Sequence, residues 1–115
     1  METLEITHRA EGAFEIVSPR GEIDLATQTK LRAALEELIT AGRADIVVDL
    51  AETTFLDSTG LGALISARRR TYASKGSFAI ICANPKMREL FSITRLDLVF
   101  RVHETFEDWA ATRPV

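Results

Sequence analysis

The sequence has 115 residues, of which 46% are hydrophobic and 27% charged. This length and composition are typical of one globular domain, so we expect a single domain over residues 1–115. The formal net charge of -3 argues against a protein that binds nucleic acid directly or binds an anionic membrane surface.

No apolar run approaches the ~20 residues that cross a bilayer. The N-terminal residues lack the basic and apolar regions of a signal peptide, so we expect a cytoplasmic protein. The single cysteine, Cys82, cannot form an intramolecular disulfide, and its apolar neighbours predict a buried, reduced thiol.

The first half of the chain predicts a hairpin, a helix and a buried strand. Residues 4–8 and 13–17 alternate between apolar and polar, and Glu11-Gly12 between them favours an antiparallel hairpin. The run Ser18-Pro19-Arg20-Gly21 breaks this pattern. An amphipathic helix follows, with Asp24 placed to cap it, Gly42 placed to end it, and an apolar face of Leu31, Ala34, Leu35, Leu38 and Ile39. Residues 45–50 then predict a strand covered on both sides.

The second half continues with a helix over 58–72, whose inward side chains we expect to be Leu61, Leu64, Ile65 and Tyr72. Residues 78–82 predict a second buried strand, and Asn84-Pro85 starts a short helix. Residues 99–102 predict an edge strand, and 105–111 a terminal helix that buries Phe106, Trp109 and Ala110.

Strand, helix and strand around residues 45–82 form a βαβ unit, which implies parallel pairing with a right-handed crossover. The expected fold class is therefore α/β, with a mixed β-sheet of four to five strands, an N-terminal hairpin, one βαβ unit and four helices.

Residues 55–64 depart from the rules of a plain scaffold. Gly60 and Gly62 lie in the first turns of the predicted helix, where each costs about 1 kcal/mol relative to alanine. They either let another surface approach the backbone and the Ser58 hydroxyl, or let the helix pack closely on the sheet. Their spacing leaves both interpretations open.

Ser58 is placed at the start of this helix, beside N–H groups that we expect to be free and at the positive end of the helix dipole. A phosphate there would add a charge of about -1.5 to -2. It would face Asp57, and also Asp24 if the two loops meet at one edge of the sheet. Phosphorylation of Ser58 would then change how this surface binds a partner.

At these residues the chain resembles the STAS domains, and specifically the bacterial anti-sigma factor antagonists. One signature of that family stands here as Asp57-Ser58-Thr59-Gly60-Leu61-Gly62, and a second as Gly21-Glu22-Ile23-Asp24. The resemblance covers essentially the whole chain in the order and length of its elements. After about Arg95 it holds only in general pattern.

This resemblance implies a phosphoprotein that regulates transcription by partner switching. The unphosphorylated protein would bind an anti-sigma factor that is also a serine kinase, and so release a sigma factor. The kinase would phosphorylate Ser58 with ATP, and a metal-dependent serine phosphatase would reverse the step. The partner-binding residues implied are Glu22, Asp24, Asp57, Ser58, Thr59, Gly60 and Gly62.

Other classes of protein fit less well. Ser58 lacks the Gly-x-Ser-x-Gly setting of a hydrolase nucleophile, and two histidines with one cysteine make no zinc ligand set, so we expect no enzyme, no metal and no cofactor. A receiver domain phosphorylated on Asp49 would need further acids after the first strand, where Thr7-His8-Arg9 stands instead. A STAS scaffold subunit of a transporter or signalling complex, without phosphorylation, stays open. No apolar face is left over, so we expect a monomer.

Overall fold

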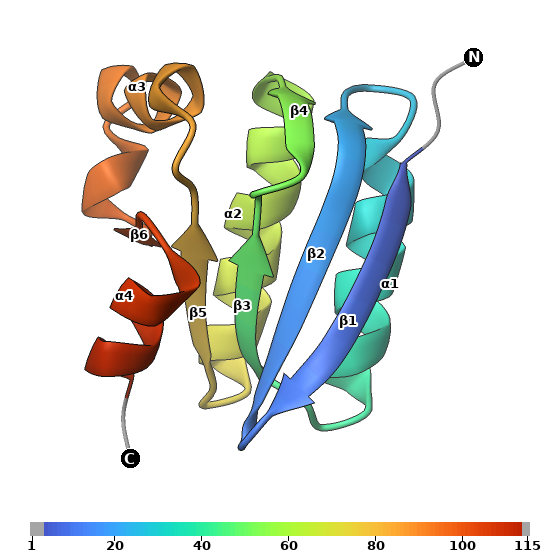
Figure 1. Cartoon of the computed structure of the whole chain (residues 1–115). Helices are drawn as coiled ribbons and strands as arrows, with labels where there is room; N and C mark the ends of the chain where they lie inside the picture. Colours follow the sequence, from blue (N-terminus) through green and yellow to red (C-terminus); the bar gives the residue numbers. More distant parts are fainter. Residues whose placement is uncertain (1–3, 114–115) are drawn as a thin grey trace.

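The computed structural model describes residues 4–113, which form one mixed sheet with helices on both of its faces (Figure 1). The strands are β1 (Glu5–Glu11), β2 (Phe14–Ile23), β3 (Asp45–Asp49), β4 (Thr53–Leu56), β5 (Ser77–Ile81) and β6 (Arg101–His103). The helices are α1 (Gln28–Thr40), α2 (Ser58–Ala73), α3 (Pro85–Ile93) and α4 (Phe106–Thr112), with a 3-10 turn at Leu96–Leu98. The α/β class, the hairpin, the βαβ unit and the four helices are confirmed.

The strand order is β1-β2-β3-β5-β6, and β4 also pairs with β2. Strands β1 and β2 are antiparallel, and every other pair is parallel. The described residues therefore contain six strands, one more than the upper end of the expected range. The additional strand is β4, which has four residues.

The expected break after residue 17 is wrong, because β2 continues without interruption to Ile23. Pro19 is tolerated there by its place in the register. Residues Glu15 to Val17 of β2 pair with β3, and Gly21 to Ile23 pair with β4, so Pro19 falls between the two parallel partners. Pro19 is also in register with Ile6 of β1, but its carbonyl accepts the Thr53 hydroxyl of β4 at 2.8 Å, so its backbone polar groups face away from β1. A proline has no N–H to donate, and on the β1 side none is needed at this position.

The sheet buries side chains on both faces because alternate residues of each strand point in opposite directions. Ile46 and Val48 of β3 pack in the larger core with α1, α2 and α3, whereas Val47 between them packs in a smaller core with Trp109 of α4. Figure 1 shows α1 and α2 on one side of the sheet and α4 on the other. Cys82 is buried in the larger core, as expected.

The helices mostly bury the predicted faces. Leu31, Leu35 and Ile39 of α1 are buried, and Asn84 caps α3 by accepting the N–H groups of Lys86 and Met87. Two details were wrong. Tyr72 lies on the exposed side of α2, where the Arg68 guanidinium stacks on its ring. The last strand begins at Arg101 rather than at residue 99. Within residues 4–113 no helix is long and apolar enough to cross a membrane.

Candidate functional site

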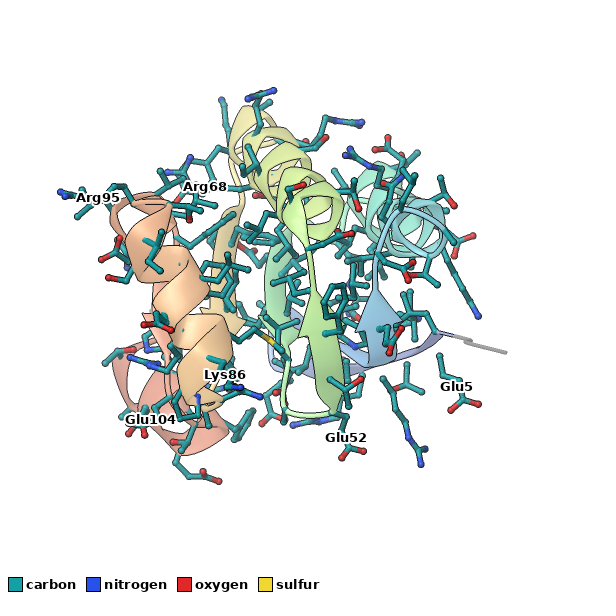
Figure 2. The ribbon with its side chains drawn as sticks, turned by 90° about the horizontal axis from the view of Figure 1, so that it is seen from above. Glu5, Glu52, Arg68, Lys86, Arg95 and Glu104 are labelled. Atoms are coloured by element: carbon teal, nitrogen blue, oxygen red, sulfur yellow. The ribbon has the colours of Figure 1, made fainter. Side chains whose placement is uncertain are left out.

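The two sequence signatures meet at one edge of the sheet. Strands β2 and β4 run parallel, with Ile23 in register with Leu56, and the Asp57 N–H donates to the Ile23 carbonyl at 3.2 Å. The turn after β2 and the start of α2 therefore lie side by side. We call residues 21–27 and 53–60 together the Ser58 edge. Figure 2 looks down on the end of the molecule that contains it, with α1 and α2 seen end-on.

Asp57 caps α2 and fixes the local backbone. Its Oδ1 accepts the N–H groups of Thr59 at 3.0 Å and Gly60 at 3.1 Å, together with the Thr59 hydroxyl at 2.6 Å. The Thr59 hydroxyl bond is the main cause that lowers the pKa of Asp57 below its ordinary value of 3.8; partial desolvation opposes it, and the two N–H bonds add to it. Asp57 is therefore ionised at neutral pH.

Ser58 is the first residue of α2 and is exposed. Within residues 4–113 its hydroxyl makes no hydrogen bond, whereas the hydroxyl of the neighbouring Thr59 is held by Asp57. The expectation of free N–H groups beside Ser58 is wrong for the next two residues, because Asp57 takes both of them. The first turn of the helix is thus occupied by a carboxylate that would repel a phosphate on Ser58.

Asp24 shapes the neighbouring turn rather than capping α1. Its Oδ1 accepts the N–H groups of Ala26 and Thr27, both at 3.0 Å, and α1 begins only at Gln28. The cap expected from Asp24 therefore does not form, because three residues of turn separate it from the helix. Thr27, which the sequence signatures do not single out, closes this turn by donating its hydroxyl to the Glu22 carbonyl at 2.7 Å.

The two glycines of α2 have different roles. Gly60 is buried, and a Cβ there would lie 2.5 Å from Leu56 Cδ1 and 2.7 Å from Ile23 Cγ2. Close packing of α2 on the sheet thus explains Gly60. At Gly62 a Cβ would meet only the tip of the Arg32 side chain, at 3.4 Å. Packing does not require a glycine at that position.

The Ser58 edge holds the carboxylates of Glu22, Asp24 and Asp57, and neither of its two segments contains a lysine, arginine or histidine. Among residues 4–113 no group of three or more His, Cys, Asp or Glu side chains is arranged to hold a metal ion. Neither histidine is a base for Ser58: His8 bonds Glu15 at 2.9 Å in the hairpin, and His103 lies on β6. The arrangement presents an exposed hydroxyl on an edge whose own charged side chains are all acidic.

Comparisons with known proteins found anti-sigma factor antagonists of similar sequence and fold. The anti-sigma-B factor antagonist of Staphylococcus aureus (strain NCTC 8325 / PS 47) is 29% identical over 104 residues, which cover 90% of this chain and 96% of that protein. The crystal structure of an anti-sigma factor antagonist from Mycobacterium paratuberculosis matches with a TM-score of 0.84 at 26% identity, covering 95% of this chain and 92% of that one.

The phosphorylated form of the Bacillus cell fate determinant SpoIIAA shares the fold, with a TM-score of 0.71 at 20% identity over 96% of this chain and 100% of that one. The family model of the STAS domain matches residues 5–109, nearly the whole chain. It spans both signatures and all of the strands described above. The chain belongs to the STAS domain family.

Proposed function

We propose that this protein is an anti-sigma factor antagonist, and that phosphorylation of Ser58 switches off its binding to an anti-sigma factor serine kinase. The observation that carries the proposal is the Ser58 hydroxyl, which is exposed and unbonded within the described chain at an edge of three carboxylates. The names of the Staphylococcus and Mycobacterium relatives support the partner class.

The geometry favours Ser58 over Thr59 as the phosphoacceptor. Thr59 would have to give up a 2.6 Å hydrogen bond to the residue that caps α2, whereas the Ser58 hydroxyl makes no hydrogen bond within the described part of the chain. In the transfer step the Ser58 oxygen would form a bond to the γ-phosphorus of ATP, the bond to the leaving ADP would break, and the hydroxyl proton would pass to a base of the kinase. The chain would act as substrate rather than as catalyst.

Release follows from charge. A phosphate adds about -1.5 to -2 at neutral pH, beside Asp57 and across the paired strands from Asp24 and Glu22. Asp57 already holds the Thr59 and Gly60 N–H groups, so the phosphate would gain little from the helix terminus. Like-charge repulsion and added bulk would then weaken the docked complex, and a metal-dependent phosphatase would restore the binding form.

The experiment compares immobilised wild-type protein with Ser58→Ala, Ser58→Asp and a matched control, Ser92→Asp, which places the same charge on an exposed residue of α3. Each purified histidine-kinase-like ATPase of the source organism is tested for binding. We expect one kinase to bind wild type, Ser58→Ala and Ser92→Asp, and to bind Ser58→Asp at least about a hundredfold more weakly. Equal binding of all four would refute the switch and leave the scaffold function in its place.

A further inference from the structure

Two large apolar side chains stand exposed at the Ser58 edge. Leu25, in the turn after β2, is 72% exposed, and Phe55, near the end of β4, is 47% exposed. Neither contributes to the two cores. A large apolar side chain left in water next to a binding residue is more informative than one that stands alone, because it gains free energy only when a partner covers it.

The chain geometry keeps both side chains near Ser58. Leu25 is two residues after Ile23, and Phe55 is two residues before Asp57, while the Ile23 carbonyl and the Asp57 N–H are hydrogen-bonded. Consecutive Cα atoms are about 3.8 Å apart. The Cα atom of Leu25 therefore lies within about 7.6 Å of that of Ile23, and the Cα atom of Phe55 within about 7.6 Å of that of Asp57. Leu25 and Phe55 thus belong to two different segments that meet next to the start of α2, where Ser58 lies.

Both positions are held by hydrogen bonds rather than left loose. The Asp24 carboxylate binds the N–H groups of Ala26 and Thr27, which fixes the turn that carries Leu25. Phe55 lies in a strand, in register with Glu22 of β2. Because Leu56 and Ile23 point into the larger core, Phe55 and Glu22 point to the opposite face of the sheet. The smaller core beneath α4 includes Phe14 and Ile16, at the other end of β2, and contains neither Glu22 nor Phe55.

The two segments that carry this pair have charges of one sign. The two segments of the Ser58 edge contribute three carboxylates and no basic side chain. Basic groups lie just outside these segments: Arg20 lies 4.0 Å from Glu52, and the Arg32 side chain approaches Gly62. Lys86 lines a shallow groove of about 190 Å³ together with Phe55, Met87 and Leu90. An acidic rim around two apolar side chains is complementary to an apolar pocket rimmed by lysine and arginine.

We infer that Leu25 and Phe55 are the apolar anchors of the complex: they enter an apolar, basic-rimmed pocket on the anti-sigma factor kinase, next to the site where Ser58 docks. This inference rests on the proposed function and names the contacts that supply its affinity. Buried apolar anchors at the centre of an interface carry most of its binding energy, while the charged rim governs the rate of association.

The test uses the purified kinase that binds the wild-type chain, and two pairs of variants matched in exposure. Leu25→Ala is compared with Leu98→Ala, since Leu98 is 71% exposed; Phe55→Ala is compared with Tyr72→Ala, since Tyr72 is 45% exposed. Calorimetry should show affinity reduced at least about tenfold by each anchor variant and changed less than about twofold by each control. Added salt should slow association for wild type.

The outcomes separate the two claims. If no kinase binds wild type or Ser58→Ala, the proposed function fails and the anchors fail with it. If the kinase binds but Leu25→Ala and Phe55→Ala bind like their controls, the function stands and the anchors are overturned. An association rate independent of salt would contradict the proposal that lysine and arginine surround the kinase pocket. Thermal unfolding checks that each variant is folded; should Phe55→Ala unfold, Leu25→Ala against Leu98→Ala decides, since Leu25 packs in neither core.

Discussion

Helices α2 and α3 both begin at the carboxyl-terminal edge of the parallel strands, and each has a side chain that accepts two backbone N–H groups. Asp57 does this for α2 and Asn84 for α3. The residues that follow differ: α2 opens with the exposed hydroxyl of Ser58, and α3 opens with Pro85, which has no group to modify. The starts of α2 and α3 therefore share their capping geometry. They differ in the charge of the capping side chain and in the first residue of the helix.

The largest effect on stability is expected from Gly60→Ala. The added Cβ would collide with Ile23 and Leu56, which are buried and have little room to move. Overpacking of this kind costs about 1–3 kcal/mol, and alanine's better helix propensity offsets about 1 kcal/mol of it. Denaturant unfolding should show a net loss of up to about 2 kcal/mol. A gain in stability would mean that α2 does not depend on close packing at Gly60.

Removing the two caps sharpens the comparison between the helices. Asn84→Ala should cost about 1 kcal/mol, as the loss of an N-cap usually does, and should leave kinase binding unchanged. Asp57→Ala should also lower the unfolding temperature, but it should in addition weaken kinase binding, because it removes a rim carboxylate next to Ser58. Thermal unfolding and calorimetry on both variants measure this. Equal effects of the two variants on binding would show that Asp57 serves only as a cap.

Gly62→Ala should act in the opposite direction to Gly60→Ala. The new Cβ would meet only the flexible tip of Arg32, so alanine should stabilise the helix by up to about 1 kcal/mol. If Gly62 is kept for access of the partner to the backbone, the same variant should bind the kinase more weakly while being more stable. Stability and affinity that rise together would remove Gly62 from the partner-binding set.

The smallest expected effect is a change in pH dependence. The pKa of Asp57 is lowered in the folded state, chiefly by the Thr59 hydroxyl, so its contribution to stability is present above 3.8 and is lost as the pH falls from 3.8 through the lowered value. Asp57→Asn keeps an acceptor but cannot titrate. Wild type should therefore lose stability relative to Asp57→Asn on acidification in this window. Parallel pH profiles of the two proteins would contradict a lowered pKa of Asp57 in the folded state. The reciprocal variant is Asn84→Asp, which places a titrating cap on α3.

Local signals in the sequence were enough to predict much of this fold. Asn84-Pro85 specifies the start of α3 by its own chemistry, and the spacing of Leu31, Leu35 and Ile39 specifies the buried face of α1. The formation of β4 and the continuation of β2 past Pro19 depend instead on the strands with which they pair. That information is spread over residues far apart in the sequence. Local pattern alone cannot supply it.

The site was predicted in the same uneven way. The acidic residues and Ser58 follow from the two signatures, and the structure brings both signatures to one edge. Spacing could not separate Gly60, which packs against Ile23, from Gly62, which has room beside it, because that difference lies in the surroundings of each residue. Likewise, Leu25 and Phe55 look like core residues in the sequence, and only the structure shows that no other part of the described chain covers them.

The most direct test of the central claim is to map the phosphate. Wild type and Ser58→Ala are incubated with the partner kinase and magnesium ATP, and intact mass, peptide mapping and rebinding to the kinase are measured. We predict one phosphate on wild type, located on Ser58, none on Ser58→Ala despite its intact Thr59, and loss of kinase binding by the phosphorylated chain. A phosphate on Thr59 or elsewhere, or a chain phosphorylated on Ser58 that still binds as before, would contradict the account.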